Sequence, residues 1–194
     1  MQIVHIFALV RECLYSVLFE TTDQRESGVE QERRTHEFDR LFDFWTDPVQ
    51  LRTFFEAHEA DLEDPFWEGL AVEEAILKTK KEAQELKKKL LAFAEADRQG
   101  KSLHLSELFS PLTDERFEKP PAREKTKIKG RKTWLRMYAV RVDTNVFVIC
   151  GGAIKLRPTI NDRDYLQVEL DKLNYTKNYL SESENDLFAL YELK

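Results

Sequence analysis

The chain is poor in the residues that build covalent frameworks and flexible linkers. Among its 194 residues are two cysteines, six glycines and six prolines. Cys13 and Cys150 lie in apolar runs and are predicted to be buried free thiols. No apolar stretch reaches the roughly 18 residues that span a membrane. Residues 1–10 lack a basic start and are interpreted as a first strand rather than a signal peptide, so the cytoplasm is the expected compartment.

Familiar catalytic motifs are absent as well. The sequence has no glycine-rich phosphate loop ending in Lys-Ser or Lys-Thr, no Gly-x-Ser-x-Gly and no His-Glu-x-x-His, the patterns of nucleotide-binding loops, serine hydrolases and zinc peptidases. His58 lies among acidic residues, but their spacing matches no known set of metal ligands. We therefore expect neither a metal ion nor a cofactor.

What is present is the composition of one globular domain. Hydrophobic residues make up 42% and charged residues 34% of the chain, which fits a single folded domain over residues 1–194. Short apolar runs at residues 3–7 and 14–19 are typical of strands. Apolar residues at helical spacing and the start signal Asp47-Pro48 predict a helical insertion over about residues 36–111. The mixture predicts an α+β fold.

The longest predicted helix covers residues 72–96. Its apolar positions alternate steps of four and three residues and include Leu86 and Leu90, which makes a heptad-like seam of about three repeats. Two interpretations stay open. The seam packs against the helix's own domain, or it docks a partner and the protein is a structural or interaction protein.

Positive charge is concentrated in one part of an acidic chain. The formal net charge is −6, which alone argues against a nucleic-acid partner. Residues 119–165 nevertheless hold 12 Lys and Arg against four Asp and Glu, a local net charge of +8. Such a block is either a solvated surface or the footprint of an anionic partner. Its first part, residues 119–129, is rich in Pro and Lys and is expected to be a connector.

A β-hairpin is the clearest motif inside this block. Strand-like runs at residues 134–142 and 146–150 flank Asp143-Thr144-Asn145, whose residue types favour a tight turn. Gly151-Gly152 indicates a bulge or a close backbone approach, and residues 165–180 have the spacing of a closing helix. Because a hairpin brings the ends of its strands together, the cations on either side of it are expected to form a concave basic patch.

Such a patch suits a phosphate-rich ligand and metal-free RNA cleavage. In that reaction the ribose 2′-hydroxyl attacks the adjacent phosphate, and fixed cations stabilise the charge of the phosphorane. A Lys or Tyr whose pKa is lowered by neighbouring cations can carry the proton transfers. Trp134 and Tyr165 offer surfaces on which an unpaired base can stack.

The hairpin resembles the matching part of RelE/ParE-type toxins of bacterial toxin–antitoxin systems. The similar stretches are Lys-Ile-Lys-Gly-Arg-Lys-Thr-Trp-Leu-Arg-Met-Tyr-Ala-Val-Arg at residues 127–141 and Asn-Val-Phe-Val-Ile-Cys-Gly-Gly-Ala-Ile-Lys-Leu-Arg at residues 145–157. The resemblance covers the C-terminal end, with the basic hairpin and closing helix at residues 127–180. It implies a small antiparallel sheet with helices packed on one side. The family's ribosome-dependent members cut mRNA without a metal, so the resemblance also implies an mRNA substrate.

The resemblance assigns roles to individual residues. Arg136 matches the family's strand arginine, and Lys155 and Arg157 match the basic pair that ends the next strand. Tyr165 is a loose match to the family's tyrosine. The candidate catalytic residues are therefore Arg136, Lys155, Arg157 and Tyr165. The candidate RNA-binding residues are Lys127, Lys129, Arg131, Lys132 and Arg163.

Two functions for the basic patch follow as hypotheses. The first is the toxin of a type II toxin–antitoxin system, an endoribonuclease held inactive by a cognate antitoxin of the helix-turn-helix type. The alternative is a non-enzymatic module that holds nucleic acid or an acidic protein on the same face. Binding that weakens steeply with salt, without cleavage, would favour the module.

Overall fold

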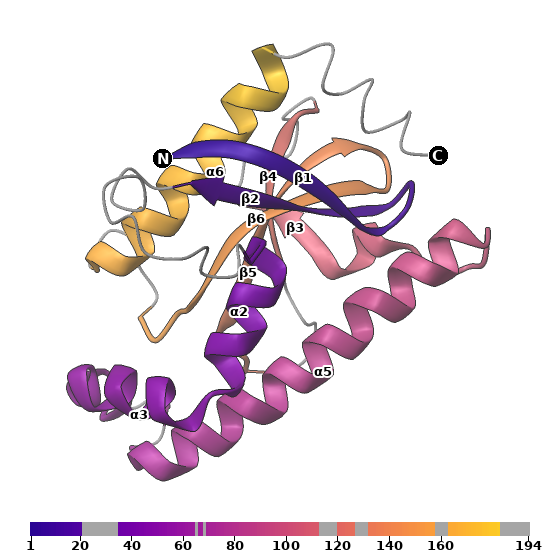
Figure 1. The fold of residues 1–194 in the computed structure, drawn as a ribbon. Helices are drawn as coiled ribbons and strands as arrows, with labels where there is room; N and C mark the ends of the chain where they lie inside the picture. Colours follow the sequence, from indigo (N-terminus) through magenta and orange to yellow (C-terminus); the bar gives the residue numbers. More distant parts are fainter. Residues whose placement is uncertain are drawn as a thin grey trace.

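Six strands form one sheet at the centre of the molecule (Figure 1). The computed structural model describes residues 1–20, 35–64, 66–67, 69–112, 120–126, 132–157 and 163–182. The strand order is β1-β2-β6-β5-β4-β3. Neighbouring strands are antiparallel except β2 and β6, which are parallel. The strands are β1 (Gln2–Val10), β2 (Leu14–Glu20), β3 (Phe109–Pro111), β4 (Ala122–Thr126), β5 (Leu135–Asp143) and β6 (Val146–Ile154). The predicted α+β class is confirmed.

Helices cover both faces of this sheet. The helical elements are α2 (Glu37–Thr46), α3 (Pro48–Ala57), α4 (Glu59–Leu62), α5 (Val72–Arg98), the 3-10 turn η1 (Leu105–Leu108) and α6 (Asp164–Glu182). Successive side chains of a strand point to opposite faces. Met137 of β5 accordingly joins the core with α2, α3 and α5, whereas its neighbour Tyr138 joins the core with α6. The implied arrangement, with helices on one side only, is therefore wrong: α6 covers the second face.

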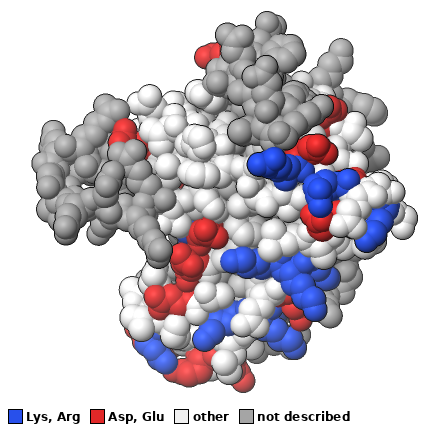
Figure 2. All heavy atoms as spheres, turned by 45° about the vertical axis from the view of Figure 1, so that its right-hand side comes forward, with Lys and Arg blue, Asp and Glu red and all other residues white. Residues whose placement is uncertain are grey.

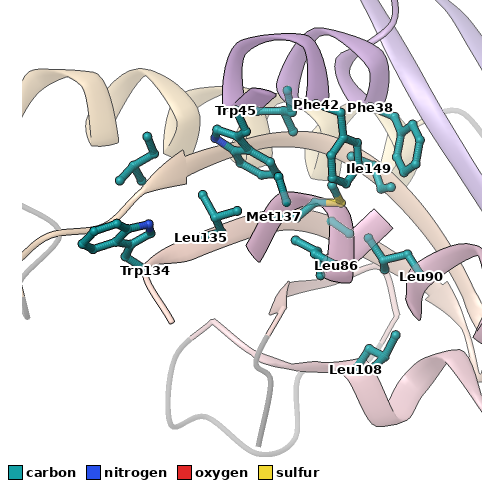
Figure 3. Close-up of a cluster of buried hydrophobic side chains, with 14 of the residues drawn as sticks. Phe38, Phe42, Trp45, Leu86, Leu90, Leu108, Trp134, Leu135, Met137 and Ile149 are labelled. Atoms are coloured by element: carbon teal, nitrogen blue, oxygen red, sulfur yellow. The ribbon is translucent and has the colours of Figure 1, made fainter. Parts of the chain in front are cut away.

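The larger core lies between the sheet and the helical region. Phe42 and Trp45 of α2 and Leu86 of α5 meet Met137 and Ile149 of the sheet in this core (Figure 3). All five side chains are at most 3% exposed. The insertion is thus part of the same folded body as the sheet. No helix within the described ranges combines the length and the apolarity needed to cross a bilayer.

Several local predictions are confirmed. The hairpin forms, with β5 ending at Asp143 and β6 beginning at Val146. Helix α3 begins after Asp47, whose carboxylate accepts from the backbone N–H of Val49 at 2.7 Å and of Gln50 at 3.2 Å, as an N-cap residue does. Both cysteines are free and buried. These features depend on neighbours in sequence.

The expected connector at residues 119–129 is wrong in its central part. Ala122–Thr126 forms β4, which lies inside the sheet between β3 and β5. Its buried positions include Glu124, which bonds Arg141 at 3.0 Å, and Thr126, whose hydroxyl accepts from the Met137 N–H at 2.9 Å. Because polar side chains fill positions that are usually apolar, the alternation that marks a strand is hidden.

The seam of α5 packs on its own domain. Leu86 and Leu90 are 2% and 0% exposed and belong to the larger core. The interpretation of the seam as a docking surface is therefore not supported, because a docking surface must be accessible. Leu77 follows the seam residue Ile76 directly, but it points away from the core and is 68% exposed.

The burial of this seam gives a matched pair of variants. We expect Leu90→Ala to lower the free energy of unfolding by about 2–5 kcal/mol because it leaves a cavity in a packed core. Leu77→Ala should change it by less than about 0.5 kcal/mol. Urea denaturation measures both. Equal effects for the two variants would contradict this packing.

Candidate functional site

Three cations from three neighbouring strands meet near one end of the sheet. Lys125 lies on β4 opposite Tyr138, Arg136 lies on β5 opposite Ala153, and Lys155 follows β6 directly. The pKa of Lys155 is lowered by burial first and then by the charges of Lys125 and Arg136. Burial also lowers the pKa of Arg136. We call Lys125, Arg136 and Lys155 the cation cluster.

Hydrogen bonds fix the Arg136 guanidinium in place. Its Nη1 lies 2.9 Å from the Thr133 carbonyl oxygen, 3.2 Å from the Thr133 hydroxyl and 2.8 Å from the Leu135 carbonyl oxygen. Lys125 donates from Nζ to the Leu112 carbonyl oxygen at 2.9 Å. Neither Arg136 nor Lys155 has a carboxylate partner in the described part of the chain. Arg136 and Lys155 thus have no carboxylate in direct contact, although the charge of Glu82 acts to raise the pKa of Arg136 and partly compensates it.

The hydroxyl of Tyr138 lies beside this cluster. It is buried and has no hydrogen-bond partner among the described residues, which is uncommon in folded proteins. Burial raises the pKa of Tyr138 to about 12, although the charge of Arg136 acts to lower it. The phenol is therefore protonated at neutral pH and retains a hydrogen-bond donor that no described residue uses.

Two of the predicted arginines lie elsewhere, in ion pairs with the helical region. Asp61 of α4 is 1% exposed and accepts from Arg157 Nε at 2.8 Å and from Arg163 Nη2 at 2.6 Å. Burial alone would raise the pKa of Asp61, but its hydrogen bonds and ion pairs with Arg163 and Arg157 hold it below its ordinary value. The structure thus separates these two arginines from Arg136 and Lys155 and uses them to attach α4 to the chain around β6.

Tyr165 is packed rather than poised for proton transfer. Its hydroxyl donates to the Ile154 carbonyl oxygen at 3.1 Å. Its ring packs edge-on against Phe54, with 5.3 Å between centroids, and lies 5.1 Å from His58. Burial, together with the charge of Asp61, raises its pKa to about 12. Tyr165 therefore stays neutral at physiological pH.

The candidate RNA-binding residues fall into three groups. Lys132 is exposed, and its Nζ lies 4.9 Å from the centroid of the Phe66 ring. Arg163 is held by Asp61 as described above. Lys127, Lys129 and Arg131 lie outside the described residues.

A buried network of four charges connects α2 to α6. Glu37 and Arg40 of α2 meet Glu169 and Lys172 of α6, and the two carboxylates are balanced by the two cations. Arg40 Nη2 lies 2.6 Å from Glu37 and 3.1 Å from Glu169, and Lys172 Nζ lies 2.9 Å from Glu169. Burial would lower the pKa of Arg40, but Glu37 and Glu169 outweigh it and raise the pKa above its ordinary value.

The two glycines of β6 make room for this network. An added Cβ at Gly151 would lie 2.5 Å from a Glu169 carboxylate oxygen, and one at Gly152 would lie 2.7 Å from the Arg136 carbonyl oxygen. The Gly152 N–H instead donates to Glu169 at 2.8 Å. The register of β6 also shifts by a residue just before Gly151. The bulge and the close approach predicted for Gly151-Gly152 are both confirmed.

A pocket of about 530 Å³ opens beside these glycines. Its walls come from α2, α3, the end of β6 and the first turns of α6. The lining residues are Thr35, Arg40, Asp43, Phe44, Gln50, Phe54, Gly152, Ala153, Ile154, Tyr165 and Glu169. Neither this pocket nor the place of Lys125 in the cation cluster is marked by a pattern in the sequence beyond Gly151-Gly152, the only local signal.

The exposed lysines of α5 form no comparable site. Helix α5 carries lysines and glutamates side by side, with Lys81 and Lys88 exposed. The view that brings the right-hand side of Figure 1 forward has blue cationic and red acidic side chains interleaved (Figure 2). Such alternation is typical of a solvated helix face. Among the described residues there is no group of three or more His, Cys, Asp or Glu that could hold a metal ion.

Comparison with known proteins found no match. No family model, no curated protein and no solved structure matches this chain. Function must therefore be argued from the residues themselves.

The Asp61 ion pairs predict a pH-dependent contribution to stability. We expect Asp61→Asn to lower the free energy of unfolding near neutral pH by about 1–3 kcal/mol, because a buried carboxylate is lost while Arg157 and Arg163 are partly exposed and rehydrate. A carboxylate whose folded pKa is depressed stabilises the fold above its unfolded pKa of about 3.9, and that contribution disappears as the pH falls through the lower folded pKa.

Urea denaturation at neutral pH and at about pH 3 tests this expectation. The difference between wild type and Asp61→Asn should be large at neutral pH and should shrink in acid. Glu56→Gln is the control, because Glu56 is an exposed carboxylate 3.8 Å from Arg52. A difference that is the same at both pH values would show that Asp61 is not stabilised as an anion.

Proposed function

We propose that the protein is a metal-independent endoribonuclease that acts as the toxin of a type II toxin–antitoxin system. The observation that carries the proposal is the convergence of Lys125, Arg136 and Lys155, with no ion pair to Arg136 or Lys155 from the part of the chain that the structure describes. Like charges repel, so such a cluster is costly to maintain in a partly buried place. A bound phosphodiester would relieve that repulsion.

The chemistry assigns a separate task to each group. When the 2′-hydroxyl attacks the phosphate, negative charge develops on the phosphorane oxygens, and the preoriented Arg136 stabilises it. Lys155 has a lowered pKa, so it loses a proton more readily than an ordinary lysine and accepts the proton of the 2′-hydroxyl. As the P–O5′ bond breaks, Lys155 returns this proton to the leaving 5′-oxygen, and the other product is a 2′,3′-cyclic phosphate. Tyr138, which is protonated at neutral pH, donates a hydrogen bond to the phosphate. Tyr165, with its hydroxyl on Ile154, positions the end of β6.

The non-enzymatic module remains the second candidate, and specific contacts favour it. Tyr165 donates its hydroxyl to the backbone, and Arg157 and Arg163 are held by Asp61. Among the described candidate catalytic residues, these contacts leave Lys155 and Arg136 with lowered pKa values, and of the two only a lysine is an ordinary proton acceptor. A face that binds RNA through its backbone needs fixed cations but no proton acceptor.

The proposed toxin function implies two partners, a substrate and an inhibitor. Its substrate is mRNA in the cytoplasm, and its inhibitor is a cognate antitoxin of the helix-turn-helix type. A small neighbouring gene for such an antitoxin would support the assignment. Neutralisation by the co-expressed neighbour is the direct test of that partnership.

Substitutions in the cation cluster test whether activity depends on the cluster itself or on positive surface charge in general. We expect the double variant Arg136→Ala, Lys155→Ala to abolish growth arrest and mRNA cleavage on induction in a bacterial host, because phosphorane stabilisation and the proton acceptor are both lost. The control Lys81→Ala, Lys88→Ala removes two exposed charges from α5 and should cleave like wild type. Intact transcripts with the wild-type protein, or a cluster variant as toxic as wild type, would refute the nuclease.

Salt dependence distinguishes the two candidates. RNA affinity of the purified protein should fall with salt in either case, and losing the charges of Arg136 and Lys155 should reduce the slope of log K against log salt concentration by about 1.4 for single-stranded RNA. Cleavage of the same RNA, followed on a gel at low salt, supports the nuclease. Salt-sensitive binding with no cleavage supports the module.

A further inference from the structure

The pocket beside Gly152 has walls suited to a flat aromatic ligand. Phe44, Phe54 and Tyr165 line it and are all partly buried. His58 stacks on one face of Phe54 at 4.5 Å, whereas Phe44 and Tyr165 approach at interplanar angles of 81° and 85°. This packing fixes the orientation of the rings. Aromatic walls of this kind provide stacking surfaces for nucleobases.

Two polar side chains one helical turn apart face the same pocket. Arg40 and Asp43 lie on α2 and both line it. The ion pairs with Glu37 and Glu169 engage Nε and Nη2 of Arg40 and so hold the guanidinium still. The Asp43 carboxylate is exposed and has no ion pair within the described ranges. A fixed donor and an available acceptor are what recognition of a base edge requires.

The pocket and the cation cluster share the end of β6. Ala153 and Ile154 line the pocket, Lys155 is the next residue, and Ala153 lies opposite Arg136 in the sheet. Two residues along a strand span roughly 7 Å. A ligand of the size of one nucleotide can therefore contact the aromatic walls and the cluster together.

We propose that this pocket binds one nucleobase, and that it favours adenine, guanine and cytosine over uracil. A carboxylate only accepts hydrogen bonds. Adenine, guanine and cytosine each carry an exocyclic amino group that donates to Asp43, whereas the single N3–H donor of uracil is flanked by two carbonyl oxygens that a carboxylate repels. The inference rests on the proposed function in that it takes the natural ligand to be RNA, but base binding itself requires no cleavage.

The test uses the four ribonucleoside 5′-monophosphates and the full chain. Calorimetric titration should give dissociation constants for AMP, GMP and CMP at least about threefold below that of UMP, the effect of one hydrogen bond. Asp43→Asn should abolish this preference. Phe44→Leu should weaken binding of all four by about fivefold or more, because a stacking surface is lost while apolar volume is kept.

The controls are chosen outside the pocket. Asp171→Asn changes an exposed carboxylate of α6, and Phe66→Leu changes a ring that is 51% exposed. Both should bind like wild type. Asp43 is exposed, so Asp43→Asn keeps the test informative even if Phe44→Leu fails to fold. Amide NMR shifts on titration should include Gly152 and Ile154.

The outcomes separate this site from the nuclease proposal. Equal binding of the four nucleotides, an unchanged preference in Asp43→Asn, or no binding at millimolar concentration overturns the pocket. If RNA is not cut but the nucleotides are ranked as expected, the nuclease fails and the pocket stands. If RNA is cut but the nucleotides are not ranked, the pocket fails and the nuclease stands.

Discussion

The parting of β2 from β6 is the constraint on which the rest of the structure depends. The two strands pair only from Leu14 to Ser16 against residues 147–149. Beyond that point α2 begins in the opening, with the Phe38 N–H donating to the Ser16 hydroxyl at 2.9 Å. Carboxylates buried in such an opening are unstable unless cations meet them. Arg40 and Lys172 supply those cations for Glu37 and Glu169. Gly151 leaves room for the Glu169 carboxylate, and the Gly152 N–H donates a hydrogen bond to it.

Because the described residues pair no strand with the β2 side of β6 beyond residue 149, the last residues of β6 contribute to two sites at once. One edge pairs with β5 and places Lys155 beside Arg136, while the other edge lines the pocket. The charges are treated differently on the two sides. The network of α2 and α6 is balanced, whereas Lys155 is desolvated beside two like charges. A fold stabilised by its charges would not retain such repulsion, and uncompensated charge of this kind is expected at functional sites.

Local pattern was enough to predict the parts of the fold whose partners are near in sequence. The hairpin at Asp143, the N-cap at Asp47 and the periodicity of α5 all follow from residue types within a turn or two. Strand β4 could not be predicted, because Glu124 and Thr126 are buried only by virtue of Arg141 and Met137 on the neighbouring strand. The pocket was out of reach for the same reason: its walls come from residues more than 100 positions apart.

The candidate site shows how far the net charge of a segment predicts the residues of an anion-binding site. The basic block was found from composition, and within it Arg136 and Lys155 do lie together. Arg157 and Arg163 have the same charge and lie in the same block, yet both form ion pairs with Asp61, on a helix that precedes them by about a hundred residues. Whether a cation is available to a ligand is decided by its nearest carboxylate in space. The net charge of a segment therefore predicts where in the chain an anion site can form. Which of its cations form that site depends on whether each one already has a carboxylate beside it in the folded structure.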